Sequence, residues 1–125
     1  MRTLTGLGII VLATMWAATS AGAQEIEPGA WTGTLTPPGG AGVPVTYEVS
    51  DANGALLIVM NNPQLGDIKF NDAWLEGDQL TFWFAPGTRV ECTLTRKEDR
   101  SFDGGCSDGR GADGQGALTM TPPSR

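Results

Sequence analysis

Apolar and polar residues alternate in eight short segments of this chain, and this period of two is the feature that most constrains its fold. Successive side chains of a β-strand point to opposite faces, so such alternation is typical of strands with one buried face. We expect no helix, and therefore an all-β domain. The predicted strands are residues 30–36, 43–50, 55–61, 68–76, 79–85, 89–95, 102–106 and 117–121.

Turn-forming residues separate these segments. The clearest signal is residues 51–54, Asp-Ala-Asn-Gly, because Asn and Gly accept the positive φ that tight hairpins require. Within residues 68–76 the apolar phase changes between Phe70 and Ala73 or Leu75, which predicts a β-bulge. The other predicted turns are residues 37–40, 77–78 and 86–87.

Eight sequential antiparallel strands remove their exposed edges most simply when the last strand pairs with the first. The predicted architecture is therefore an eight-stranded up-and-down β-barrel. An open two-sheet β-sandwich is the alternative, since the same alternation permits it.

The chain has two cysteines, Cys92 and Cys106, on neighbouring predicted strands. A hairpin turn centred on Asp99 places Arg96 opposite Phe102 and Cys92 opposite Cys106. We therefore predict an intramolecular disulfide that faces the barrel interior with the apolar residues of both strands. On the chain-entropy estimate this bridge contributes up to about 3 kcal/mol, and less in a hairpin that already holds the two residues close.

The first 23 residues have the pattern of an export signal. Arg2 provides the positive start, residues 7–18 are an apolar run, and Ala21-Gly22-Ala23 is a small-residue cleavage site. The alternative is an uncleaved membrane anchor, but the run is shorter than the roughly 20 residues that span a bilayer. We expect a signal peptide over residues 1–23, a single domain over residues 24–125, and a periplasmic or secreted protein without lipid.

Composition excludes several partners and chemistries. Fourteen acidic residues against eight basic ones give a net charge of −6 at pH 7, which disfavours nucleic acid and, after signal cleavage, a membrane surface. The chain has no histidine, so the usual general base and the commonest metal ligand are missing. We expect no enzymatic activity, no cofactor and no metal. The Asp- and Gly-rich residues 103–114 leave calcium as an alternative, but they lack the EF-hand spacing and are better explained as an acidic loop.

The first predicted strand contains Trp31-Thr32-Gly33-Thr34-Leu35. This W-x-G-x-L opening, followed by a meander, resembles the calycin-like, lipocalin-type small β-domains of exported bacterial proteins. The resemblance implies a barrel that binds a small apolar molecule or another protein. The cysteine pair departs from it, because a glycine and a large apolar residue are expected at the two positions.

The apolar phase of the strands predicts one core, and two kinds of binding site follow. If the barrel interior is hollow, Trp31, Tyr47, Phe82 and Phe84 line a site for a small apolar ligand. These and the other core residues are also large enough to fill it. The predicted core is Trp31, Leu35, Val45, Tyr47, Val49, Phe82, Phe84, Val90, Phe102, Leu118 and Met120.

Three apolar residues fall on the opposite, outward phase of their strands: Leu57, Val59 and Trp83. A covering loop or terminal segment would explain them. The sharper hypothesis is an apolar patch that binds another exported protein or a second copy of this chain. The predicted function is thus a non-enzymatic protein-interaction or binding module. The alternatives are a carrier of a small apolar ligand and an inhibitor of an exported protease.

Overall fold

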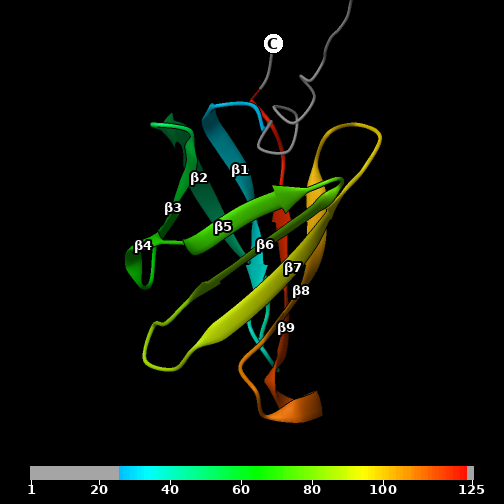
Figure 1. Ribbon diagram of the computed structural model, residues 1–125. Coiled ribbons are helices and arrows are strands. Elements are labelled where there is room, and N and C mark those ends of the chain that lie inside the picture. The colour runs from blue at the N-terminus through cyan, green and yellow to red at the C-terminus, as the bar shows by residue number, and fades with distance from the viewer. Residues whose placement is uncertain (1–25, 124–125) are drawn as a thin grey trace, which may run out of the picture.

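The computed structural model describes residues 26–123, so the predicted signal peptide and the predicted first residue of the mature chain lie outside the described residues. All nine strands form one antiparallel sheet in the order β4-β3-β2-β1-β9-β8-β7-β6-β5 (Figure 1). The strands are β1 (Gly29–Thr36), β2 (Val43–Ala52), β3 (Ala55–Asn62), β4 (Gly66–Lys69), β5 (Asn71–Glu76), β6 (Gln79–Phe84), β7 (Val90–Arg96), β8 (Phe102–Ser107) and β9 (Gln115–Met120).

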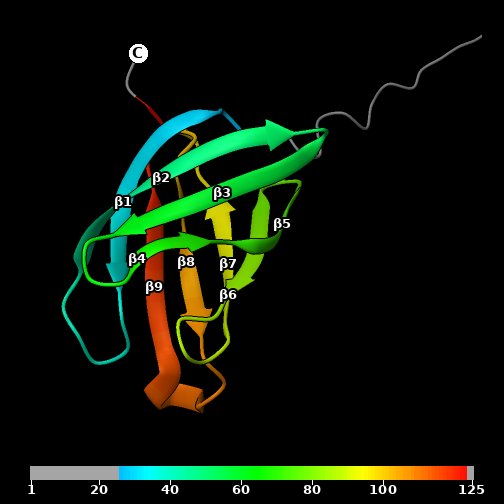
Figure 2. The same cartoon turned by 90° about the vertical axis from the view of Figure 1, so that its left-hand side faces the viewer.

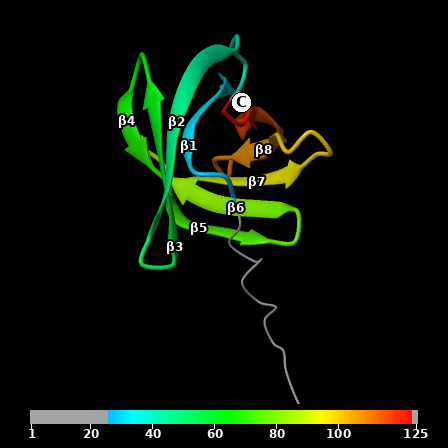
Figure 3. The ribbon, with the colours of Figure 1, turned by 90° about the horizontal axis from the view of Figure 1, so that it is seen from above.

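The sheet curls into a nearly closed barrel, as the alternation predicts (Figures 2 and 3). The last strand pairs with the first through Leu35 opposite Leu118, and two backbone hydrogen bonds of 3.1 and 2.6 Å join Thr32 to Thr121. The sandwich alternative is therefore wrong, because one continuous sheet connects the first strand to the last.

The expected fourth strand is divided in two, which makes nine strands instead of eight. Phe70 separates β4, which pairs with β3, from β5, which pairs with β6. The pairing register shifts between Asn71 and Trp74, and Asp72 has a φ of 53°. The predicted bulge is confirmed, and it bends this strand away from β3 toward β6.

Other local predictions are also confirmed. Asn53 and Gly54 both have positive φ, 57° and 84°, between the closing pair Ala52 and Ala55 of the β2–β3 hairpin. One element was not expected: a short 3₁₀ helix, η2 (Gly111–Gly114), lies within the segment predicted as an irregular loop.

The predicted core is confirmed. Nine of its members are buried, and Leu35 and Val90 are half-buried and packed against them. Phe70, which the alternation did not assign to the core, stacks on Phe82 with ring centroids 3.9 Å apart. The further buried apolar residues are Ile58, Met60, Phe70, Leu75, Leu80, Cys92, Leu94 and Cys106.

The W-x-G element of β1 helps to close the barrel. A Cβ atom on Gly33 would lie 1.9 Å from the carbonyl oxygen of Thr119, so no side chain fits there. That carbonyl accepts a 2.8 Å hydrogen bond from the buried Tyr47 hydroxyl, whose pKa is raised by burial. The Trp31 indole N–H donates to the Glu27 carbonyl at 2.7 Å. Both buried polar groups are thereby satisfied.

The disulfide forms as predicted. Cys92 lies directly opposite Cys106, their Cα atoms are 4.1 Å apart, and both residues are buried in the core. Arg96 lies opposite Phe102, which confirms the predicted register of the hairpin. A buried structural disulfide is typical of a protein that folds outside the cytoplasm. None of residues 26–123 belongs to a helix long and apolar enough to cross a membrane.

Candidate binding surfaces

The residues predicted to line an interior ligand site all lie inside the barrel. Trp31, Tyr47, Phe82 and Phe84 are almost fully buried. Phe70 packs among three of them. It stacks on Phe82, and its ring centroid lies 5.5 Å from that of Phe84 and 6.1 Å from that of Tyr47. At this level the barrel holds packed aromatic side chains.

The three residues predicted to form an outer patch lie on the outer face and are half-buried. They are not brought together as one bare surface, because Asn71 on β5 lies opposite Trp83 and Lys69 on β4 lies opposite Val59. The Arg89 guanidinium lies 4.1 Å from the centre of the Trp83 ring, and the indole N–H donates to Asp72 at 2.8 Å. Trp83 is therefore covered by polar neighbours.

Trp74 on β5 is the exposed aromatic residue that the sequence interpretation missed. Half of its surface, 50%, is open to solvent. It lies opposite Thr81, while the next pair, Leu75 and Leu80, points into the core. The signal was present in the sequence, since a bulge that restores Leu75 to the core turns Trp74 outward.

Trp74 borders a seam in the barrel. The pairing of β3 with β4 ends with Val59 opposite Lys69. One further backbone hydrogen bond follows, from the Phe70 N–H to the Ile58 carbonyl at 2.9 Å. Beyond this point, among the described residues 26–123, residues 55–57 of β3 pair only with β2, and β5 pairs only with β6. The β2–β3 and β5–β6 hairpins diverge here (Figure 3).

A groove of about 610 Å³ lies between these two strand edges. We call it the seam groove. Its lining is mainly apolar, with one cation and one anion, and it includes Leu56, Leu57, Lys69, Phe70, Asp72 and Trp74. A surface of this kind can accept an extended backbone along the unpaired edges and apolar side chains between them.

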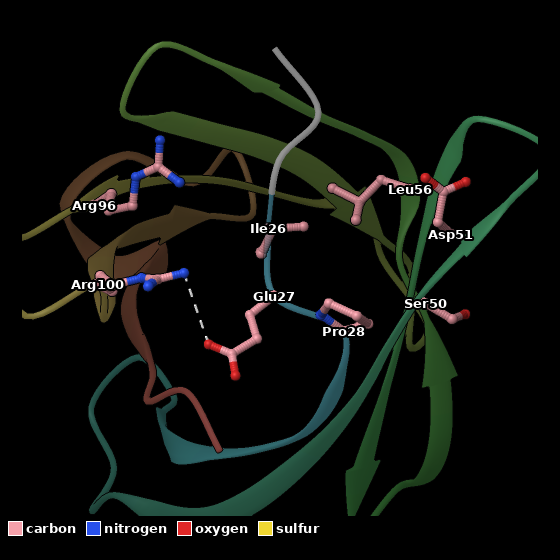
Figure 4. A pocket seen from close by; sticks show the side chains of 8 residues that line it. All are labelled: Ile26, Glu27, Pro28, Ser50, Asp51, Leu56, Arg96 and Arg100. Atoms are coloured by element: carbon pink, nitrogen blue, oxygen red, sulfur yellow. Dashed lines mark ion pairs between the residues drawn. The ribbon is translucent and has the colours of Figure 1, made fainter. Parts of the chain in front are cut away.

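A second pocket, of about 520 Å³, lies at the end of the barrel that the N-terminal residues 26–28 cross (Figure 4). Leu56 lines both this pocket and the seam groove. The two cations that line this second pocket, Arg96 and Arg100, already have anionic partners in this chain. The Arg100 guanidinium lies 3.8 Å from the Glu27 carboxylate, and the Arg96 guanidinium donates to Asp78 at 3.2 Å.

A third, smaller pocket of about 140 Å³ lies at the opposite end, which we call the far-end pocket. It is almost entirely apolar and reaches the buried disulfide at Cys106. The rim residue Leu65 is 53% exposed. The other apolar residues that line the far-end pocket include Leu35, Pro38, Phe84, Pro86 and Val90.

The acidic loop between β8 and β9 is held together by its own side chains. The Asp108 carboxylate accepts hydrogen bonds from the backbone N–H of Arg110 at 3.0 Å and from its guanidinium at 2.8 Å. Burial acts to raise the pKa of Asp108, but these bonds and the arginine charge hold the pKa below its ordinary value. Among residues 26–123, no three His, Cys, Asp or Glu side chains are arranged to hold a metal ion.

Charge is distributed unevenly around the barrel. Residues 43–76 carry five acidic side chains and one lysine, a net charge of −4, whereas residues 79–120 carry six acidic and five basic ones, a net charge of −1. Within the described part of the chain, none of the five ion pairs uses a residue of 43–76. The charged residues of 43–76 are all exposed: Glu48, Asp51, Asp67, Lys69, Asp72 and Glu76.

Comparisons of the chain with protein-family models, curated proteins and solved structures found no match. The molecule is thus defined by its own geometry, as a nearly closed antiparallel barrel with a packed interior, one disulfide and one open seam.

Proposed function

We propose that this protein is an exported, non-enzymatic protein-interaction module whose binding surface is the seam groove. One observation carries the proposal: two unpaired strand edges flank an apolar groove beside the half-exposed Trp74. Unpaired strand edges readily pair with another chain, and soluble proteins usually cover or charge them. Tryptophan is enriched among the residues that contribute most to protein–protein binding.

The proposal revises the outer patch predicted from sequence. Leu57 belongs to the binding surface because it lines the seam groove, and Val59 flanks it on the same strand. Trp74 replaces Trp83 as the aromatic anchor, since Trp83 is half-buried and already contacts Arg89 and Asp72.

A matched pair of variants tests the proposal. Trp74→Ser and Leu65→Ser each remove a large side chain that is about half exposed, but Trp74 lines the seam groove and Leu65 lines the far-end pocket. We expect Trp74→Ser to abolish both partner capture from the exported fraction and selection of displayed peptides, and Leu65→Ser to leave both unchanged. Equal binding by the wild type and Trp74→Ser would refute the seam as the interaction surface.

Export rests on the N-terminal pattern together with the disulfide. We infer that cleavage after Ala23 releases a chain that begins at Gln24 and carries no lipid. Intact-mass analysis of the protein recovered from the host envelope or medium tests this directly. A mass that includes residues 1–23, or added acyl chains, would contradict it.

A second candidate function is binding of a small apolar molecule, supported by the far-end pocket. Its volume of about 140 Å³ suits a single ring-sized group, since a dry apolar cavity of about 150 Å³ can bind benzene. This would agree with the resemblance to calycin-like domains, although the pocket lies at the end of the barrel and of the four predicted residues only Phe84 lines it. Benzene or indole titrated against the protein should shift NMR signals of Leu35 and Val90, and Val90→Phe should abolish the shifts. Unchanged spectra would remove this candidate.

A further inference from the structure

We propose that the partner of the seam groove is an extended, basic polypeptide segment that adds to the free edge of β5 as a further strand. This inference rests on the proposed function and identifies the chemistry of the partner. Two features of the seam carry it: the geometry of its edges and the charge of the surface around it.

The edges determine the conformation of the partner. β5 is six residues long, and within the part of the chain that the structure describes it pairs on one side only. The facing residues 55–57 of β3 likewise have no strand partner there on the seam side. An extended chain laid along β5 can pair with its backbone and direct alternate side chains to opposite faces. One set of these side chains faces the core side of the groove at Leu56 and Phe70, where apolar side chains fit. The other set lies on the outer face beside Trp74 and Glu76, where basic side chains fit.

The charge determines the side chains that flank those contacts. The strands around the seam, residues 43–76, have a net charge of −4, and their acidic side chains form no ion pair with any residue of 26–123. Lysine or arginine in the added strand would therefore find exposed carboxylates on β5 itself, at Asp72 and Glu76, while the one cation of the groove, Lys69, lies on β4. Complementary charge of this kind accelerates encounter and selects among partners.

The same charge argues against a second copy of this chain as the occupant. Pairing β5 with β5 of another molecule would bring together two strands that each contain Asp72 and Glu76 and no basic residue. Like charges placed opposite one another across a sheet are destabilising. A basic segment of another protein meets no such repulsion along β5, and the one cation that lines the groove, Lys69, lies on β4.

Three synthetic peptides, each about as long as β5, test the inference. The first alternates Lys with Val, the second replaces every Lys with Glu, and the third is the Lys peptide with a central Pro that prevents strand pairing. We expect the Lys peptide to bind in calorimetric titration, at least about tenfold more tightly than the other two. Because the carboxylates are exposed, binding should weaken as salt rises from about 0.05 to 0.3 M.

Protein variants locate the binding. Glu76→Lys should weaken the Lys peptide roughly three- to tenfold, as expected when an exposed charge contact on β5 is replaced by a repulsion. The matched control is Glu98→Lys, an exposed acidic residue in the β7–β8 turn of the other half, which should leave binding within about twofold. Trp74→Ser should weaken binding without altering the charge.

The outcomes separate this inference from the proposed function. Equal binding of the Lys and Glu peptides, or of the Pro-containing peptide, would overturn the basic extended strand. If such results accompanied partner capture that still depends on Trp74, the interaction module would stand with a different partner. Peptide binding that Glu98→Lys weakens as much as Glu76→Lys would show a general attraction to an acidic protein, and would also overturn the inference.

Discussion

The two sides of the barrel differ in how completely their strands are paired. β6, β7, β8 and β9 each have a neighbour on both sides, and a disulfide joins two of them. On the other side the strand is interrupted at Phe70, and β4 and β5 each pair on one side only among the described residues. We call these the closed half, residues 79–120, and the seam half, residues 43–76.

Charge follows the same division. The closed half nearly balances its acidic and basic side chains and joins them in ion pairs, such as Lys97 with Asp103 at 3.1 Å and Arg89 with Glu91 at 2.9 Å. The seam half leaves its carboxylates without cations from residues 26–123. The comparison shows that the closed half pairs its own strand edges and most of its charges. The seam half instead leaves strand edges and carboxylates that a partner can use.

The largest expected effect comes from breaking the closed half at Gly104. A Cβ atom there would lie 2.1 Å from the Thr93 carbonyl oxygen and 2.7 Å from the Leu94 Cα, so the backbone must move. Gly104→Ala should lower the free energy of unfolding by about 3 kcal/mol or more. Gly105→Ala is the control, since its Cβ would meet only the Gly116 carbonyl, at 3.7 Å. Urea denaturation measures both, and equal losses would refute the close approach of β7 and β8 at Gly104.

Removal of the disulfide should have the next largest effect. Cys92→Ala combined with Cys106→Ala should lower the free energy of unfolding by about 2 kcal/mol, because the bridge closes a short loop within a hairpin. The seam lies outside this hairpin, so we expect binding at Trp74 to persist in the double variant below its melting temperature. Loss of binding in the folded double variant would show that the two halves are coupled.

Hydrogen exchange should separate the halves without any mutation. Backbone amides on the free edge of β5 should exchange at least about tenfold faster than those of β7 and β8, because local opening is easier where strands are unpaired. A bound partner strand should slow the β5 amides selectively. Uniform protection across both halves in the free protein would contradict the open seam.

The smallest expected effect concerns pH. Hydrogen bonds from the Ser101 hydroxyl and backbone N–H hold the pKa of Asp99 below its ordinary value in the β7–β8 turn. A folded-state pKa below the unfolded value adds stability above the unfolded pKa of about 3.9, and this stability is lost as pH falls through the folded-state pKa. Asp99→Asn should therefore be less stable than the wild type at pH 7, and the difference should shrink below about pH 4. Thermal unfolding at several pH values measures this, and a constant difference would contradict the lowered pKa.

Much of the fold follows from the local pattern. The β2–β3 turn at Asn53-Gly54, the bulge after Phe70 and the register that joins Cys92 to Cys106 are all predicted correctly, because each depends on residues close together in the chain. The period of two also assigns Phe82 and Phe84 to the core. Alternation says less about Phe70, which lies between two strands rather than in the phase of either.

The candidate site could be predicted only in part. The alternation identifies Leu57 and Trp83 as outward apolar residues. It does not reveal that Arg89 and Asp72 contact Trp83, or that Trp74 is left exposed. The far-end pocket was not expected either. The pocket is lined by Leu35, Leu65 and Phe84, which come from different strands and turns. A short-range sequence pattern cannot predict that these residues lie close together.

Strand positions, turn types, disulfide pairing and most of the core can thus be derived from the sequence, because the alternation of side chains and the φ preferences of Asn and Gly act over a few residues. The strand at Phe70 turns from β3 to β6, and this choice depends on pairings between segments far apart in the chain. Only the assembled, nearly closed barrel therefore decides which edges remain free. It also decides that Trp74, Leu57 and Asp72 share one surface, because that surface exists only when β3 and β5 are held beside each other by the rest of the sheet.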